Sequence, residues 1–272
     1  MSPAPRLTPV SLGHAPHLRD ADATLRPHPD RKVLEKRLAA LGPRIADASE
    51  ALYAERKRSV LIVLQGRDAS GKDGVARRVL GFVHPQGLAI AAFGAPSELE
   101  RRHDFLWRVH NAVPAAGMIG VFNRSHYEEV LVQRVRDWVP PTTWRARYGQ
   151  INEFERSLTL NGVTILKFML HVSRDEQRER FLERLNKPLK NWKFREGDLD
   201  DRALWPDYTR AYRDAIRMCN TPWARWHVVP ADHKLVRDYL IARTFAETLE
   251  RMSPEYPLAS AELKRRCKKE LD

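Results

Sequence analysis

The chain has 272 residues, of which 47 are Lys or Arg and 35 are Asp or Glu, so its net charge is +12. Hydrophobic residues make up 43% of the chain, which excludes a collagen-like or globally disordered protein, and no apolar run approaches the ~20 residues that span a bilayer. The length indicates one large α/β domain or two small ones, and the charge indicates either a polyanionic partner or a solvated basic surface.

Residues 1–35 contain no continuous apolar segment of the kind found in secretory signals. Two cysteines, Cys219 and Cys267, are too few for a disulfide scaffold or a Cys-based zinc site. The ten histidines show no convincing zinc-binding spacing, and we interpret His126 and His171 as structural. We therefore expect a cytoplasmic protein that does not bind a membrane.

The N-terminal residues 1–30 are rich in Pro, His and Ala and have no stable period, which predicts an extended arm over the surface. Residues 31–58 carry apolar side chains at helical spacing. Pro43 predicts a break or a fresh helix start within this stretch, because proline lacks the N–H donor that a helix interior needs. At the other end, the basic residues of 256–272 predict a solvated tail.

Short apolar segments and helix-like segments alternate along the middle of the chain. The predicted strands are 60–65, 88–93, 118–122, 163–170 and 225–229. The predicted helices are 71–83, 97–112, 125–138, 144–160, 173–185, 203–219 and 233–251. This alternation predicts right-handed crossovers and a parallel five-stranded sheet. We expect one three-layer α/β domain over 31–255, with an inserted segment near 184–200.

A glycine-rich segment from Gly66 to Gly74 follows the first apolar strand and opens a helix, which is the context that a phosphate-binding G-x-x-x-x-G-K loop needs. The glycines let successive N–H groups face an anion, and Lys72 adds a full positive charge. The predicted phosphate- and nucleotide-binding residues are Gly66, Ala69, Ser70, Gly71, Lys72 and Asp73.

Two acidic residues distinguish this loop from the usual pattern. Asp73 stands where a Ser or Thr normally binds Mg²⁺, and Asp68 lies among the glycines. A carboxylate in a phosphate cradle repels the phosphate unless a divalent cation lies between them. Asp68 is therefore a candidate Mg²⁺ ligand or base, and Asp73 is a candidate to share that role. The alternatives are a turn residue at 68 and a favourable first-turn helix charge at 73.

A second candidate metal position follows the predicted strand 118–122. A metal-binding Asp commonly ends such a strand, but this chain has Asn123, which carries no charge. Glu128 or Glu129 could supply the missing negative charge. The spacing of Ser125 and Glu128 is also that of a helix capping box, so both interpretations stay open.

A basic segment covers residues 184–195, in which five of the twelve side chains are basic and none is acidic. Pro188 is expected to end the preceding helix, and Trp192 and Phe194 are expected to anchor the segment. A mobile basic segment that closes over phosphates is typical of small P-loop kinases. A solvated loop or an RNA-binding patch are the alternatives. Arg124, at the strand exit beside the phosphate loop, is expected to contact phosphate.

Taken together, these segments resemble the polyphosphate kinase 2 family. The resemblance covers roughly residues 30–250 in order. It is carried by GRDASGKDG at 66–74, FNRSHYEE at 122–129, KPLKNWKF at 187–194, ALWPDY at 203–208 and ADHK at 231–234. A chance phosphate loop would not bring the other blocks along at suitable spacing.

The resemblance implies a P-loop kinase fold related to thymidylate kinase, with a helical lid and a single catalytic domain. It implies Mg²⁺-dependent phosphoryl transfer between inorganic polyphosphate and nucleotides. Asp68 and Lys72 fall on functional positions of the family, and the usual second metal carboxylate falls at Asn123. Asn there, followed by Ser-His-Tyr-Glu, resembles the class III subgroup, which phosphorylates both AMP and ADP.

From these observations we predict a site with three groups of residues. The predicted catalytic residues are Asp68, Lys72, Arg124 and Glu128. The predicted polyphosphate-binding residues are Arg124, Arg184, Lys190 and Lys193, and the predicted Mg²⁺ ligands are Asp68, Asn123 and Glu128. We expect adenine nucleotides as partners, with guanine nucleotides left open, no nucleic acid, and a homo-oligomer. An ATP-dependent nucleoside monophosphate kinase and a non-catalytic nucleic-acid-binding protein are the alternatives.

Overall fold

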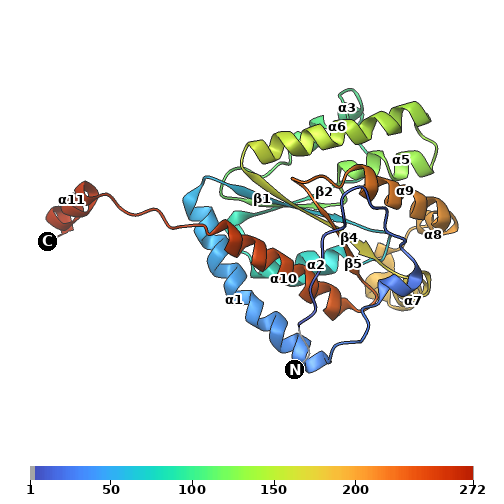
Figure 1. Cartoon of the computed structure of the whole chain (residues 1–272), viewed down its shortest axis with the longest axis horizontal. Coiled ribbons are helices and arrows are strands. Elements are labelled where there is room, and N and C mark those ends of the chain that lie inside the picture. The colour runs from blue at the N-terminus through green and yellow to red at the C-terminus, as the bar shows by residue number, and fades with distance from the viewer. Residues whose placement is uncertain (1–3, 272) are drawn as a thin grey trace.

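The computed structural model describes residues 4–271 and contains one parallel sheet of five strands in the order β2-β3-β1-β4-β5 (Figure 1). The strands are β1 Ser59–Gln65, β2 Leu88–Ala92, β3 Ile119–Asn123, β4 Val163–His171 and β5 Trp226–Pro230. Each lies within a residue or two of its predicted position. The predicted α/β fold with a parallel five-stranded sheet is confirmed.

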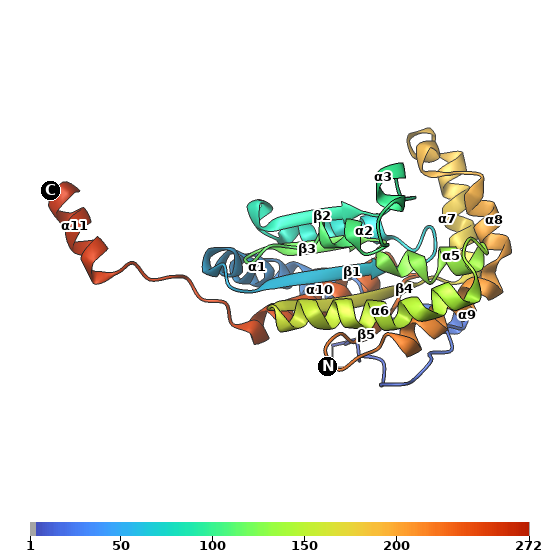
Figure 2. The ribbon, with the colours of Figure 1, turned by 90° about the horizontal axis from the view of Figure 1, so that it is seen from above.

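Helices connect the strands and cover both faces of the sheet (Figure 2). Those before β4 are α1 Arg31–Glu55, α2 Lys72–Arg78, α3 Glu98–Arg101, α4 Trp107–His110, α5 Val132–Val135 and α6 Pro141–Leu160. Those after β4 are α7 Arg174–Asn186, α8 Gly197–Ala203, α9 Trp205–Met218, α10 Lys234–Met252 and α11 Ala261–Leu271. Within residues 4–271, none of these helices is long and apolar enough to cross a membrane.

The central strand β1 shows how the three layers form. All seven of its residues are buried, and successive side chains point to opposite faces. Val60, Ile62 and Leu64 pack with α1, α2 and α10, whereas Leu61 and Val63 pack with α6 and α9. A strand covered on both faces therefore has a continuous apolar sequence rather than an alternating one.

Because all five strands are parallel, their carboxyl ends meet at one edge of the sheet. In open α/β sheets the ligand site lies outside this edge. The loop after β1, the residues after β3 and the start of α7 all lie there (Figure 2). The fold thus brings together the segments that the sequence analysis selected.

Helix α1 corrects the predicted break at Pro43, because it runs without interruption from Arg31 to Glu55. The Asp30 carboxylate caps its start by accepting a hydrogen bond from the Val33 N–H at 2.9 Å. Its buried residues include Leu34, Leu41, Ile45 and Leu52, which pack in the same cluster as α10. Proline removes only its own N–H donor, and this packing along the whole helix outweighs that loss.

Three predicted helices are shorter than expected. The segment 71–83 becomes α2 followed by a 3-10 turn at Leu80–Phe82. The segment 97–112 is divided between α3 and α4, because the Asp104 carboxylate accepts the Leu106 N–H at 2.9 Å and forms a turn. The segment 125–138 contains a 3-10 turn at His126–Glu129 and then α5. Apolar spacing alone does not reveal such local side-chain-to-backbone hydrogen bonds.

The N-terminal arm from residue 4 to 30 lies along the β5 side of the sheet (Figure 1). The Val10 N–H donates to the Trp226 carbonyl at 2.8 Å, and Asn220 donates to the Val10 carbonyl at 2.8 Å. Leu18, within the arm, is buried in the same apolar cluster as Leu61 of β1. At the other end of the chain, α11 projects away from the rest of the molecule (Figure 2).

Candidate active site at the carboxyl edge of the sheet

The backbone of the phosphate loop needs glycine at two positions. Gly66 has φ +151°, and a Cβ there would lie 2.6 Å from the Leu170 carbonyl oxygen. Gly71 has φ +99°, and a Cβ there would lie 1.8 Å from Nη1 of Arg237. Any side chain at either position would displace a neighbour and strain the backbone, so the glycines are fixed by contact as well as by conformation.

Buried donors hold the outer side of the loop. Gln177 donates to the Asp68 carbonyl at 3.0 Å, Arg180 to the Ala69 carbonyl at 2.8 Å, and Arg237 to the Ser70 carbonyl at 3.3 Å. The C=O and N–H bonds of a trans peptide group point in opposite directions, so the N–H groups of the loop point away from these donors. The N–H groups of Gly71, Lys72 and Asp73 have no acceptor among residues 4–271. The loop therefore presents free donors, as an anion-binding loop must.

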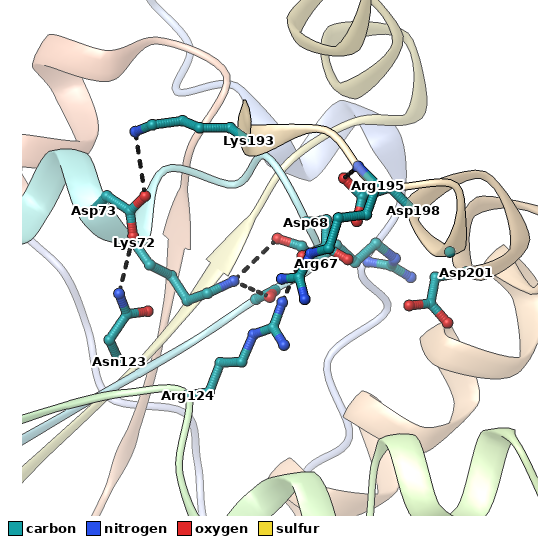
Figure 3. A network of polar contacts seen from close by, with 12 residues as sticks. Arg67, Asp68, Lys72, Asp73, Asn123, Arg124, Lys193, Arg195, Asp198 and Asp201 are labelled. Atoms are coloured by element: carbon teal, nitrogen blue, oxygen red, sulfur yellow. Dashed lines mark hydrogen bonds and ion pairs between the residues drawn. The ribbon is translucent and has the colours of Figure 1, made fainter. Parts of the chain in front are cut away.

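Lys72 is the buried cation of the loop, with 8% of its surface exposed. Its Nζ donates to the Gly66 carbonyl at 2.7 Å and to the Arg67 carbonyl at 3.3 Å (Figure 3). Burial lowers the pKa of this ammonium group, and nearby Asp68 opposes that shift. A phosphate oxygen would replace these neutral carbonyl partners with a charged one, which stabilises the ammonium form.

Asp68 and Arg124 form an ion pair across the end of β1. Arg124 Nη2 lies 2.8 Å from Asp68 Oδ1 (Figure 3). Arg124 has φ +63°, a conformation that few non-glycine residues adopt, directly after β3 ends. Its N–H donates to the Leu64 carbonyl of β1 at 3.1 Å, so the strained residue is fixed beside the loop. Arg124 is thereby aimed at the place where a phosphate would bind.

Asp68 and Arg124 both line a small cavity of about 50 Å³, which Glu128, Tyr208 and Tyr212 also line. Burial raises the pKa of the Glu128 carboxyl, although Arg124 and Lys72 oppose that shift. With Asp201 and Arg67, three carboxylates and two guanidinium groups thus line one small cavity. Perturbed ionisable groups in a cleft are typical of functional sites.

The structure rejects the capping box at residue 125. The Ser125 hydroxyl accepts from the Tyr127 N–H at 3.2 Å and from Gln65 Nε2 at 3.0 Å, and it makes no bond to the N–H of Glu128. A 3-10 turn begins here instead of an α-helix. Glu128 is therefore free to line the cavity. Glu129 is bound elsewhere, at 2.8 Å from Nη1 of Arg147.

Asn123 and Asp73 lie on the other side of Lys72 from Asp68 (Figure 3). Asn123 Nδ2 donates to Asp73 Oδ1 at 2.9 Å, and Lys193 Nζ lies 3.5 Å from Asp73 Oδ2. The predicted metal ligands therefore divide into two places: Asp68 and Glu128 share the cavity, and Asn123 does not line it.

The cavity offers Mg²⁺ a small set of carboxylate ligands. Within residues 4–271, no group of three or more His, Cys, Asp and Glu side chains is arranged to hold a metal ion. Asp68 and Glu128 nevertheless offer two hard carboxylates beside a loop with free N–H donors. Mg²⁺ in phosphate-transfer sites commonly takes one or two carboxylates and completes its shell with water and substrate phosphate oxygens. The residues fit such an ion.

The basic segment 184–195 forms the end of α7, a 3-10 turn at Pro188–Lys193 and the approach to α8. Four of its five cations, those at 184, 187, 190 and 193, are paired with carboxylates. Arg184 lies 3.3 Å from Asp198, and Lys190 lies 2.8 Å from Glu183. Lys187 and Lys190 lower the pKa of Glu183 to about 2.

Only one of the two predicted anchors holds this segment. Phe194 packs edge-on against Phe181 with 5.5 Å between ring centroids. Trp192 is 76% exposed, so its predicted anchoring role is wrong. Its indole N–H donates to the Leu189 carbonyl at 3.1 Å, within the same turn, rather than to the body of the protein.

Sequence reasoning missed Arg67, which lines the cavity from within the loop. Its guanidinium lies 4.0 Å from the centre of the Trp205 ring and donates to the Thr209 hydroxyl at 2.5 Å. Burial lowers its pKa to about 10. The spacing of Tyr208 and Tyr212 on α9 would have shown one shared helix face, but not that this face meets the loop.

A buried ion pair between β4 and α6 holds the segment that follows β3 in place. Lys167 Nζ on β4 lies 2.6 Å from Glu155 Oε2 and 2.8 Å from the Tyr127 hydroxyl. Both charged side chains have no exposed surface. His126 also contacts Glu155, at 3.3 Å, and burial lowers the pKa of His126. His126 thus packs as a structural residue, and Tyr127 holds the turn that carries Glu128.

A larger cavity of about 850 Å³ lies elsewhere, between the N-terminal arm, β4 and α10. It contains none of the predicted site residues. Its cations Arg6 and Arg44 are paired with Glu247 and Glu250. The smaller cavity at the phosphate loop is therefore the candidate active site, because chemistry rather than volume identifies it.

Comparisons with known proteins give matches that cover most of the chain. The polyphosphate kinase 2 (PPK2) family model matches residues 28–257. An AMP/ADP-polyphosphate phosphotransferase of Meiothermus ruber is 49% identical over 238 residues, which cover 88% of this chain and 89% of that protein. An ADP-polyphosphate phosphotransferase of Rhodopseudomonas palustris is 43% identical over 226 residues, covering 79% and 78%.

A solved structure gives the same result. The crystal structure of polyphosphate kinase 2 from Arthrobacter aurescens superimposes with a TM-score of 0.86 at 39% identity, covering 92% of this chain and 90% of that one. The match by sequence includes the phosphate loop, the residues after β3 and the basic segment, and it ends at residue 257, before α11 begins at Ala261.

Proposed function

The chain belongs to the polyphosphate kinase 2 family, and on that premise we propose that it transfers phosphoryl groups from inorganic polyphosphate to AMP and to ADP. The observation that carries this proposal is the cavity beside the phosphate loop, which Asp68, Arg124 and Glu128 line together. The name of the M. ruber relative supports both acceptors. Asn123 in place of an acidic residue supports the class III interpretation.

In this proposal the loop binds the phosphate of the accepting nucleotide. The N–H groups of Gly71, Lys72 and Asp73 donate to its oxygens, and Lys72 exchanges its carbonyl partners for phosphate. Arg124 stabilises the charge that spreads over the transferred group. The attacking phosphate oxygen is already ionised, so holding the reactants in line contributes more than base catalysis.

Asp68 and Glu128 would hold Mg²⁺, which neutralises phosphate charge when it is bound. The polymer is proposed to lie along Arg124, Arg184, Lys190 and Lys193. In the structure the last three of these are paired with Asp198, Glu183 and Asp73 respectively. Polyphosphate must therefore displace carboxylates from the basic segment before it is bound there.

The test mixes purified protein, Mg²⁺, long-chain polyphosphate and AMP, and resolves AMP, ADP and ATP over time. Successive appearance of ADP and then ATP is the expected result. A parallel reaction replaces polyphosphate with ATP as the donor. Activity with ATP and none with polyphosphate would instead identify a nucleoside monophosphate kinase. RNA binding without any nucleotide turnover would identify a nucleic-acid-binding protein.

Two further parts of the proposal concern the state of the protein. We propose a cytoplasmic homo-oligomer that takes adenine nucleotides, with guanine nucleotides to be compared in the same assay. Cys219 and Cys267 form no disulfide in the described chain, which suits a reducing compartment. Light scattering of the purified protein measures the oligomeric state.

A further inference from the structure

The C-terminal helix α11 packs against no other element of residues 4–271. Every residue from Ala261 to Leu271 is exposed, and the preceding residues 253–260 form an extended connection to α10. Figure 2 shows the helix standing well away from the sheet and its covering helices. An isolated helix of this length is only marginally stable in water. Because α11 gains no stability from packing within the described chain, its role must be sought in a binding partner.

Most of the basic side chains of α11 gather on one side of the helix. Residues four apart share a face of an α-helix. Lys264 with Lys268, and Arg265 with Lys269, form two adjacent rows that hold four cations. None of these four forms an ion pair with residues 4–271, whereas Arg266 pairs with Glu270 at 3.0 Å on a different row. One side of the helix is thus a continuous, uncompensated cationic surface.

We propose that this cationic face of α11 is a second binding site for polyphosphate, which captures long chains and tethers them to the molecule while another part of the same chain occupies the active site. The proposal rests on the proposed function, because that function supplies a polyanionic donor. A phosphate polymer needs only separated cations from its partner, since each unit adds a charge. The site also lies outside residues 28–257, which match the family model.

Other polyanionic partners suit this helix less well. The apolar row of α11 consists of Leu263, Cys267 and Leu271 and contains no aromatic residue, so it offers little to insert into a membrane. Without aromatic side chains it also has nothing on which nucleic-acid bases could stack. Cations arranged along a helix, without stacking or insertion groups, favour a polymer of bare phosphate.

The position of α11 predicts a dependence on polymer length. Near the start of α10, Arg237 contacts the phosphate loop through the Ser70 carbonyl. From Arg237 to Met252 the helix rises about 22 Å, and the extended residues 253–260 add up to about 28 Å. A ligand that touches α11 and the loop together must span tens of ångströms. Tripolyphosphate cannot do so, whereas a long chain can, and its second contact is then intramolecular.

The experiment compares the full chain with a variant in which Lys264, Arg265, Lys268 and Lys269 are all changed to Gln. At low salt, the KM for long-chain polyphosphate is expected to rise about tenfold in the variant. The KM for tripolyphosphate, the KM for AMP and the melting temperature are expected to stay unchanged, because α11 packs on nothing. The difference between the two proteins should shrink as salt is added.

A matched pair of single variants tests the face itself. Lys268→Gln and Arg266→Gln remove one charge each from opposite sides of the helix, and only Lys268→Gln is expected to raise the KM for the long polymer. Equal effects of the two would overturn the proposal, as would an equal shift for both polymer lengths or an unchanged KM in the fourfold variant. Tighter binding of the full chain to phosphatidylglycerol vesicles or to single-stranded RNA than to long-chain polyphosphate would also overturn it. Turnover of tripolyphosphate in every variant shows that the proposed function holds independently.

Discussion

The phosphate loop and the basic segment 184–195 hold their cations in different ways. Lys72 of the loop is buried and bound to two backbone carbonyls. Lys190 and Lys193 are 41% and 35% exposed at the side chain and are paired with carboxylates. A carbonyl is neutral and fixed, so an arriving phosphate gains a charged contact at Lys72. A carboxylate competes with phosphate for the same charge, so binding at the basic segment is adjustable.

This comparison separates catalysis from polymer binding. The loop is rigid, since buried residues of α7 and α10 hold its carbonyls. The lysines of the basic segment are held by exposed ion pairs, each of which contributes little and is screened by salt. We therefore expect substitutions in the loop to change kcat and substitutions in the basic segment to change the KM for polyphosphate.

The largest effect is expected from Lys72→Ala. Removal of a preorganised charge from a transferring phosphate typically reduces the rate at least ~10²-fold. The protein should still melt near the parent temperature, because Lys72 bonds only to carbonyls of its own loop. Turnover and thermal melting measured on the same preparation check this. Parent-like turnover would show that the loop is not the active site.

A smaller loss, of more than ~10-fold, is expected from Asp68→Asn, because this carboxylate both pairs with Arg124 and is the main proposed Mg²⁺ contact. Glu128→Gln should reduce activity less, but it should change the pH profile. Burial raises the pKa of Glu128, so the active carboxylate is lost as the pH falls through that raised value. The acidic limb of the rate profile should therefore flatten in Glu128→Gln. If Asp68→Asn keeps nearly full activity at low Mg²⁺, the metal site is misassigned.

In the basic segment, Lys190→Ala combined with Lys193→Ala should raise the KM for polyphosphate several-fold and weaken its salt dependence. Glu183→Gln should change the KM in the opposite direction, because it releases Lys190 from its carboxylate partner. Loss of the exposed ion pairs that Glu183 forms with Lys187, Lys190 and Lys234 should lower the KM for polyphosphate by roughly two- to fivefold. Steady-state kinetics over a salt series would measure both. A change confined to the KM for AMP would assign the segment to the nucleotide instead.

The smallest effect is expected from Asn123→Asp. The new carboxylate would replace an amide that donates to Asp73 at 2.9 Å, so two negative charges would meet there. The pair should draw in a cation, which makes the rate depend more steeply on Mg²⁺ and changes the ratio of AMP to ADP phosphorylation a few-fold. Adding Asp73→Asn to this variant restores one carboxylate and should restore the parent ratio. An unchanged ratio in Asn123→Asp would rule out residue 123 as a determinant of acceptor choice.

The sequence predicted the strands well because each is a short apolar run that the sheet buries on both faces, as in β1. It predicted poorly where backbone groups bond to nearby side chains, as at Asp104 and Ser125, because such bonds leave no periodic pattern. The phosphate loop and the position of Arg124 beside it were predicted from local sequence motifs. Arg67 and its contact with Trp205 could not be predicted, since they depend on how α9 packs against the loop.

The N-terminal arm has a consequence for the solubility of the chain. β5 is an edge strand, and an open edge offers unpaired N–H and carbonyl groups to strands of other molecules. The arm occupies part of this edge through Val10, whose N–H and carbonyl bond to Trp226 and Asn220. Apart from a 3-10 turn at Asp20–Ala23 the arm is irregular, yet it protects part of the edge strand against aggregation. A chain that lacked it would expose a strand ready to pair with its own copies.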